Sequence, residues 1–241
     1  MTRGLTPSPL APCLTLGPDV QLGEGVLLGA SVTIHGGTVL EDGCEVQDGA
    51  VLGKQPRLGR LSSASREPLS PLIVGRGAVV CANAVVYAGS RLSEEAIVGD
   101  QAQVRERVII GRGSVIGRGT GVEGDVAVGA HVRIQSNCFL APHTVVEDDV
   151  FVGPGVTTAN DNTMARHRAG AVLRGPILRQ ACRVGAGAVL VPGIEIGRDA
   201  FVAAGAVVCS DVPPGAVVMG VPARQRRSVP EEDRWEAWAS A

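Results

Sequence analysis

The chain has 241 residues and a formal net charge of −2, and 45% of its residues are hydrophobic although only 2% are aromatic. The near-neutral charge argues against a polyanionic partner such as nucleic acid, and the length suits a single domain. Residues 1–17 are too broken by Pro and Gly for a signal peptide or membrane span, so we expect a cytoplasmic protein with no membrane partner.

A period of six residues follows an expected N-terminal cap over 1–15 and runs through 16–51. Each hexad begins with Leu, Ile or Val, from Leu16 to Val46, and a small residue is common at its fifth position. A large aliphatic and a small residue four positions apart can both point into a narrow coil, and a hexapeptide period is a signature of the parallel β-helix. Frequent glycine and the absence of a 3.6-residue period argue against helices.

The first interruption of the period covers residues 52–73 and is rich in Pro and Ser. It carries four basic residues, Arg57 among them, against a single acidic residue, Glu67. Polar segments with Pro and Ser between two periodic runs are typical of surface loops. We therefore expect a basic loop that projects from the coil.

The period resumes over 74–157 and, after a second interruption at 158–177, over 178–213. With three short strands per turn a coil contains three hexads, so the three blocks together make about nine coils. The second interruption, TANDNTMARHRAGAVLRGPI, begins with the most polar stretch of the chain. An uninterrupted prism has smooth faces, and long loops in compact folds are usually functional, so we expect this loop to form the wall of a site.

The period ends before the tail at 214–241. Within the tail, Pro230–Ala239 predicts a short helix with Trp235 and Trp238 on one side. We expect the tail to cover the open end of the coil, because exposed strand edges invite aggregation. The whole of 1–241 is thus predicted to form one β-helix domain.

Several segments resemble known enzymes that are built from this repeat. The hexads, the segments RIQSN and EDDVFVGPGV, the polar loop with Asn160 and the ending DVPPGAVVMGVPAR are similar to the hexapeptide-repeat acyltransferases, most of all to the N-acetyltransferases of nucleotide-linked amino sugars. The resemblance implies an all-β, left-handed parallel β-helix, a homotrimer with active sites between neighbouring subunits, and acetyl-CoA as co-substrate. Flat faces rich in Val, Ala and Gly also suit packing against copies of the same chain.

In such an enzyme the CoA donor is expected along the C-terminal coils. Backbone amides at four small residues would meet the pantetheine arm, and three arginines of the tail would meet the phosphates, which guanidinium groups bind well. A solvated tail is the alternative for the arginines. The expected donor-binding residues are Gly185, Ala186, Ala204, Gly205, Arg224, Arg226 and Arg227.

Three polar residues at fourth hexad positions suggest an acid–base site. Asp125, His143 and Asp161 follow one another at steps of three hexads, so they would stack one coil above another if the register continues past Thr157. A histidine between two carboxylates is held in one tautomer and can accept a proton from an attacking amine or hydroxyl. The alternative is a solvated polar face of the coil.

The resemblance adds a role for the second loop. Asn160 is expected to hydrogen-bond the acceptor or the oxyanion and to form the catalytic set together with Asp161 and His143. The basic first loop is expected to reach the acceptor's diphosphate or a neighbouring subunit, with a solvated loop as the alternative. The expected acceptor contacts are Asn162, His167 and Arg57.

These expectations define an acetyl-CoA-dependent N-acetyltransferase that acts on a nucleotide-linked amino sugar, a small-molecule acceptor, and requires no metal. Transfer to a hydroxyl of a sugar or other small molecule is one alternative, and a non-catalytic trimeric β-helix scaffold is another. A zinc site of the β-helix carbonic anhydrase type needs three histidines at fixed spacings. Here His131 and His143 are separated by two hexads, which places them on different faces.

Overall fold

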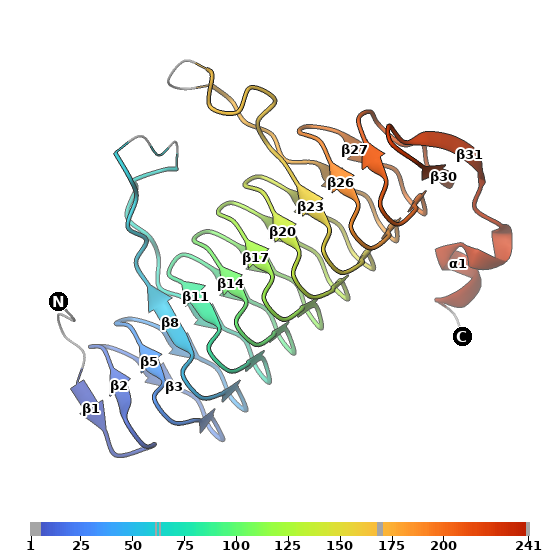
Figure 1. Ribbon diagram of the computed structural model, residues 1–241. Coiled ribbons are helices and arrows are strands. Elements are labelled where there is room, and N and C mark those ends of the chain that lie inside the picture. The colour runs from blue at the N-terminus through green and yellow to red at the C-terminus, as the bar shows by residue number, and fades with distance from the viewer. Residues whose placement is uncertain (1–5, 61, 63, 168–170, 240–241) are drawn as a thin grey trace.

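The computed structural model describes residues 6–60, 62, 64–167 and 171–239. Short strands wind round a common axis and stack into a long prism with three flat sides (Figure 1). The first five residues of the expected N-terminal cap lie outside the described residues.

Three sheets, which we call A, B and C, form the sides of the prism and contain 11, 9 and 11 strands in the described part of the chain. The strands of sheet A, in spatial order, are β1 (Thr6–Ser8), β2 (Leu14–Leu16), β5 (Thr33–Ile34), β8 (Val51–Lys54), β11 (Val85–Tyr87), β14 (Gln103–Val104), β17 (Gly121–Val122), β20 (Phe139–Leu140), β23 (Thr157–Thr158), β26 (Val189–Leu190) and β29 (Val207–Val208). Those of sheet B are β3 (Gln21–Leu22), β6 (Val39–Leu40), β9 (Ile73–Val74), β12 (Arg91–Leu92), β15 (Ile109–Ile110), β18 (Ala127–Val128), β21 (Val145–Val146), β24 (Ile177–Leu178) and β27 (Glu195–Ile196). Those of sheet C are β4 (Leu27–Leu28), β7 (Glu45–Val46), β10 (Val79–Val80), β13 (Ile97–Val98), β16 (Val115–Ile116), β19 (Arg133–Ile134), β22 (Phe151–Val152), β25 (Arg183–Val184), β28 (Phe201–Val202), β30 (Ala216–Met219) and β31 (Arg224–Ser228).

The strand register confirms a coil of three hexads. Arg91 pairs with Ile109 and Ile109 with Ala127, so each strand lies beside the strand one full turn later. The aliphatic residues at the first hexad positions point inward and are almost fully buried, as Leu92 and Ile110 are. The predicted fold class, an all-β parallel β-helix of hexapeptide repeats with a short C-terminal helical segment, is confirmed.

Buried hydroxyl groups at fifth hexad positions tie successive coils together. The Ser114 hydroxyl donates to the Gly129 carbonyl at 2.7 Å and accepts the Val132 amide at 2.9 Å. Thr120 makes the same two bonds one strand further on. A buried polar group is tolerated when its hydrogen bonds are satisfied, so these small residues fit the core as well as alanine does.

Both long interruptions leave the prism at one corner. β8 and β23 belong to sheet A, and the chain re-enters sheet B at β9 after the first interruption and at β24 after the second. Figure 1 shows the two loops projecting from the same edge of the prism. The corner between sheets A and B therefore has a wall at each end, and the corners of the intervening coils form a floor between them.

The C-terminal tail covers the last edge of sheet C and packs against one side of the prism. β31 pairs antiparallel with β30 and occupies the edge of sheet C. A 3-10 turn, η1 (Glu231–Asp233), leads into α1 (Trp235–Trp238). The Trp235 amide donates to Asp199 at 2.8 Å and the Arg183 guanidinium lies 4.8 Å from the Trp238 ring, so this short helix packs against the side of the last coils.

No helix in the described ranges is both long enough and apolar enough to cross a membrane.

Candidate functional site

A groove of about 400 Å³ lies at the A–B corner between the two loops. Ser62 and Ser65 of the first loop line one wall, and Asn160 and Leu173 of the second loop line the other. The corners of three successive coils supply the floor. The floor residues include Arg105, Glu106, Glu123, Asp125, Pro142 and His143.

A buried ion pair anchors the lower floor of the groove. Arg105 binds Glu106 through two nitrogens, at 2.8 and 3.1 Å, and the Glu106 side chain is only 1% exposed. The Arg105 guanidinium also lies 5.1 Å from the Tyr87 ring centroid, a cation–π contact. Its remaining nitrogen faces Glu123 at 3.5 Å, so Arg105 is fixed in place and shared between two carboxylates.

The next corner position holds a second ion pair beneath His143. Arg107 binds the two oxygens of Asp125 at 2.6 and 2.9 Å. These bonds lower the pKa of Asp125, and His143 adds a smaller electrostatic contribution in the same direction. Asp125 and His143 both adopt positive φ, of 62° and 65°, at equivalent corners of neighbouring coils. The predicted stacking of Asp125 under His143 is confirmed.

The upper member of the predicted stack is not where the spacing put it. The place above His143 is taken by Gly175, since a Cβ on that glycine would lie 2.7 Å from the His143 carbonyl carbon. Val145 pairs with Ile177, which shows that the second loop has replaced the expected step of three hexads. The prediction that Asp161 stacks directly over His143 is therefore wrong, because the register does not continue past Thr158.

Asp161 instead organises its own loop. Its carboxylate accepts hydrogen bonds from the amide and hydroxyl of Thr163 and from the Ala165 amide, each at 2.7 Å. These bonds, the Thr163 hydroxyl first, lower the pKa of Asp161 to about 2. The His167 Nε2 atom lies 3.3 Å from the same carboxylate. Both carboxylate oxygens of Asp161 already accept hydrogen bonds from within the loop, so the geometry favours a positioning role.

The second loop separates the predicted site residues into two groups. Asn160 lies at the boundary and lines both the groove and a second pocket of about 330 Å³ on the other side of the loop. Asp161, Asn162 and His167 line that second pocket. Arg57 is exposed on the first loop and lines neither. Of the predicted catalytic set, the groove thus contains His143 and Asn160.

The four small residues of the predicted donor set lie together at the corner between sheets C and A. Gly185 stacks so closely on Ala204 that a Cβ at position 185 would collide with the Ala204 nitrogen, and Gly205 donates its amide to Ala186 at 2.8 Å. Arg224 pairs with Met219, the last residue of the strand that leads to this corner. The other two arginines, Arg226 and Arg227, are exposed on the same edge strand.

Two backbone amides at this donor corner are available to a ligand. At the same corner of earlier coils, the amides of Ala30 and Ala82 are bound by the carboxylates of Asp48 and Asp100 from the next coil, whereas those of Arg118 and Ser136 have no partner among the described residues. Ala186 and Ala204 are exposed, and their amides have no partner among the residues that the structure describes. A column of free amides is a suitable donor set for the carbonyls of an extended ligand.

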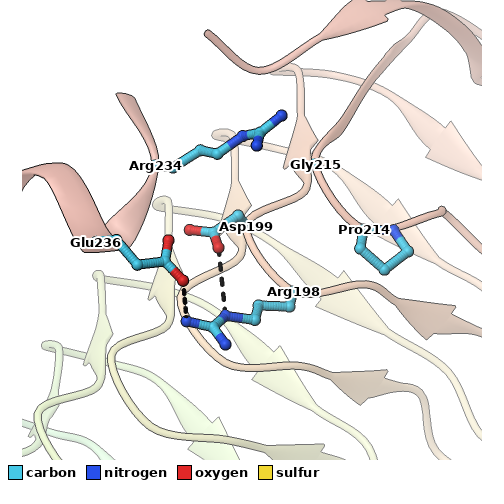
Figure 2. A pocket seen from close by; sticks show the side chains of 6 residues that line it. All are labelled: Arg198, Asp199, Pro214, Gly215, Arg234 and Glu236. Atoms are coloured by element: carbon cyan, nitrogen blue, oxygen red, sulfur yellow. Dashed lines mark hydrogen bonds and ion pairs between the residues drawn. The ribbon is translucent and has the colours of Figure 1, made fainter. Parts of the chain in front are cut away.

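A third pocket, of about 230 Å³, lies where α1 meets the last coils. Figure 2 shows Arg198 between Asp199 and Glu236, with Arg234 on the opposite side. Arg198, Asp199 and Glu236 are engaged with one another and with the start of α1, whereas the buried Nε of Arg234 has no hydrogen-bond partner among the described residues. We therefore attribute it to the attachment of the C-terminal helix.

The structure also bears on metal binding. Within the described ranges, no group of three His, Cys, Asp or Glu side chains is arranged to hold a metal ion. His131 faces Asp149 at 3.7 Å, at a different corner from His143. All six cysteines are free thiols, and Cys44, Cys138 and Cys182 are buried in the core as their fifth positions predict.

The sequence reasoning missed the carboxylates of the groove floor. Glu106 and Glu123 were not among the predicted site residues, although Arg105 and Glu123 are three hexads apart and thus stack by the arithmetic that pairs Asp125 with His143. The serines of the first loop were also missed. Their signal is weaker, because nothing in the period tells where a projecting loop folds back.

Family models match two parts of the chain. The model of the bacterial transferase hexapeptide (six repeats) matches residues 19–54, and that of the hexapeptide repeat of succinyl-transferase matches residues 180–210. The structure superposes on Arabidopsis UDP-N-acetylglucosamine acyltransferase with a TM-score of 0.51 and 17% identity, over 95% of this chain and 75% of that one. The chain has the fold of the hexapeptide-repeat transferases.

Sequence relatives match shorter stretches. The chain is 39% identical over 80 residues to serine acetyltransferase of Salmonella typhimurium, a match that covers 33% of this chain and 27% of the relative. It is 45% identical over 58 residues to 2,3,4,5-tetrahydropyridine-2,6-dicarboxylate N-acetyltransferase of Clostridium perfringens, which covers 24% and 25%. The matches thus span about a quarter of the length of these relatives.

Proposed function

We propose that the protein transfers an acetyl group from acetyl-CoA to the amine of an amino sugar that is carried on a nucleotide. The observation that carries the proposal is the pair of free, stacked amides at Ala186 and Ala204 beside the exposed Arg224. Amides suit the carbonyls of a pantetheine arm, and a guanidinium suits its phosphates. Relatives named serine acetyltransferase and 2,3,4,5-tetrahydropyridine-2,6-dicarboxylate N-acetyltransferase support the reaction class.

The donor corner and the acceptor groove lie at opposite ends of the strands of sheet A. The donor corner precedes each strand of that sheet, and the groove with His143 and Asn160 follows it. One side of a coil is a single hexad, so up to about 20 Å separates the two corners within one coil, whereas acetyl transfer requires the thioester and the acceptor to be in contact. A donor bound at one corner of a subunit is therefore best placed to meet the groove of a neighbouring copy, and we propose a homotrimer with its active sites between subunits.

In the proposed reaction the acceptor's amine or hydroxyl attacks the thioester carbonyl from the groove. His143, oriented over Asp125, takes the proton that the nucleophile loses. Asn160 holds the acceptor or donates a hydrogen bond to the oxyanion, which stabilises the charge that forms there. The C–S bond then breaks, and the departing thiolate takes up a proton to leave as free CoA.

The second loop has a supporting role in this proposal. Asp161 fixes the loop through Thr163 and Ala165 and holds His167 at 3.3 Å. Asn162 and His167 then contact the outer part of the acceptor from the second pocket, and Arg57 of the first loop approaches its phosphates. Exact placement of the acceptor by such contacts contributes to the rate, because misplaced reactants lose much of the benefit of being bound.

Transfer to a hydroxyl is a second candidate, and one observation favours it. A hydroxyl needs a base to attack a thioester, whereas a neutral amine does not. The groove places His143 over Asp125, whose carboxylate is bound by Arg107, and a neutral amine would not need this acid–base pair.

Calorimetric titration with acetyl-CoA and with CoA tests the donor half of the proposal. We expect saturable heat with both ligands at concentrations up to the millimolar range. Replacement of Arg224, Arg226 and Arg227 by Ala should weaken binding, whereas Arg76→Ala, an exposed arginine on an early coil, should not. No heat with either ligand would instead support a non-catalytic scaffold.

A further inference from the structure

The groove floor contains a carboxylate that the reaction above does not use. Glu123 lines the groove beside Asp125 and one coil below the corner of His143. Its side chain is 26% exposed, and its ion-pair contact is the 3.5 Å approach of Arg105. The two other carboxylates of the floor, Glu106 and Asp125, are each held by an arginine through two bonds of 2.6 to 3.1 Å.

Arg105 cannot turn fully toward Glu123. Its Nε and Nη2 atoms are bound to Glu106, and its guanidinium lies on the Tyr87 ring. A bidentate pair with a side chain that is 1% exposed fixes both distance and orientation, so the third nitrogen stays at the edge of hydrogen-bond range from Glu123. The Glu123 carboxylate therefore lacks the strong donors that its neighbours possess.

The carboxylates around Glu123 outnumber the arginines that pair with them. Arg105 and Arg107 face three carboxylates, those of Glu106, Glu123 and Asp125. Loss of solvent is the main cause that raises the pKa of Glu123, Arg105 opposes it, and Glu106 adds to it. A partly desolvated carboxylate of this kind is stabilised by a ligand that brings its own charged donors.

We propose that Glu123 binds the amino group of the acceptor, so that the amine-bearing end of the molecule enters the groove and its phosphates stay outside. The proposal rests on the transferase function proposed above and adds the polarity of the acceptor's entry. An ammonium supplies three N–H donors to a carboxylate whose ion-pair partner among the described residues, Arg105, lies at 3.5 Å. A phosphate in the same place would face three carboxylates within a half-enclosed space, where like charges repel strongly.

The first loop completes the amine subsite. Ser62 and Ser65 lie across the groove from the floor, and Ala64 between them also lines it. Hydroxyls both donate and accept hydrogen bonds, so they suit the ring hydroxyls that flank an amine on a sugar. Arg57 and Arg60, which are exposed on the same loop, then remain for the acceptor's anionic end.

The test compares D-glucosamine with D-glucose, two probes that differ in one amino group. Binding to the full-length protein is measured by nuclear magnetic resonance titration at about pH 6.5, where the amine is cationic. We expect glucosamine to bind about tenfold or more tightly than glucose, since a hydrogen bond to a charged group is worth at least that factor. Glu123→Gln keeps the shape and removes the charge, and it should abolish the preference.

Two controls make the outcome decisive. Glu94→Gln alters an exposed glutamate at another corner, 3.6 Å from Arg112, and should keep the wild-type preference. Equal binding of the two sugars to the wild type, or a preference that survives Glu123→Gln, overturns the proposal. Acetyl-CoA binding is measured on the same samples: its absence would reject the transferase function, whereas its presence together with equal sugar binding would reject only the role of Glu123.

Discussion

Thr158→Val tests how the corner that carries His143 is joined to the loop that carries Asn160. Thr158 is 1% exposed and its hydroxyl accepts the Ala141 amide at 2.7 Å. Ala141 is itself 2% exposed, so its N–H has no access to water. Valine has nearly the same shape as threonine, and the substitution therefore removes this bond without opening a cavity.

The magnitude follows from which bonds are lost. The Thr144 hydroxyl already donates to the Ala141 carbonyl at 2.7 Å, so it keeps its own bond when Thr158 is changed. The remaining contacts of the Thr158 hydroxyl are long, at 3.2 and 3.4 Å. The main loss is one buried amide without an acceptor, worth about 1–3 kcal/mol. For a chain of this size that is a fall in melting temperature of about 2–12 °C.

The assay is thermal unfolding and urea unfolding, both followed by far-ultraviolet circular dichroism. The matched control is Thr157→Val, the same change at the exposed neighbour, for which we expect less than about 0.5 kcal/mol. We also expect Thr158→Val to lower acetyl transfer, because the corner and the loop lose their shared bond. If the two variants unfold at the same temperature, the bond between Thr158 and Ala141 does not hold the two segments together.

Three further predictions concern Glu123, His143 and the oligomeric state. Burial raises the pKa of Glu123, so the contribution of this side chain to stability is present at pH values below its unfolded pKa and is lost as the pH rises through its folded pKa. Glu123→Gln should therefore raise the melting temperature at pH 7 and leave it unchanged near pH 4. A lower melting temperature at pH 7 would contradict the assignment. His143→Ala should lower acetyl transfer about a hundredfold with unchanged acetyl-CoA binding, and a change of only a few-fold would show that the nucleophile needs no base. Light scattering at micromolar concentration should give about three times 24.7 kDa, and a fully active monomer would exclude a site shared between subunits.

The regular part of the fold could be predicted because its information is local. Each hexad states by itself which residue is large and inward, so Leu92, Ile110 and Val128 stack along sheet B as their spacing requires. The same arithmetic placed Asp125 under His143. Both inferences need only the step of three hexads, and the coil keeps that step wherever the hexads are unbroken.

The rest of the site depends on the two loops, where the step of three hexads is interrupted. The period does not encode how far a loop travels before the coil resumes, and the second loop returns with Gly175, not Asp161, above His143. Asp161 could then form its own hydrogen-bonded turn with Thr163 and Ala165. The approach of Ser62 and Ser65 to the floor likewise depends on the path of a loop, which repeats in the coil do not determine.

Acetyl-CoA-dependent release of free thiol in the presence of a panel of acceptors would show whether this β-helix transfers acetyl groups from CoA. The panel should pair each nucleotide-linked amino sugar with its hydroxyl counterpart. We predict thiol release that depends on the acceptor, is faster with the amine of each pair, and is lost in the His143→Ala and Asn160→Ala variants. Release that is absent with every acceptor, or that proceeds equally in both variants, would contradict the account.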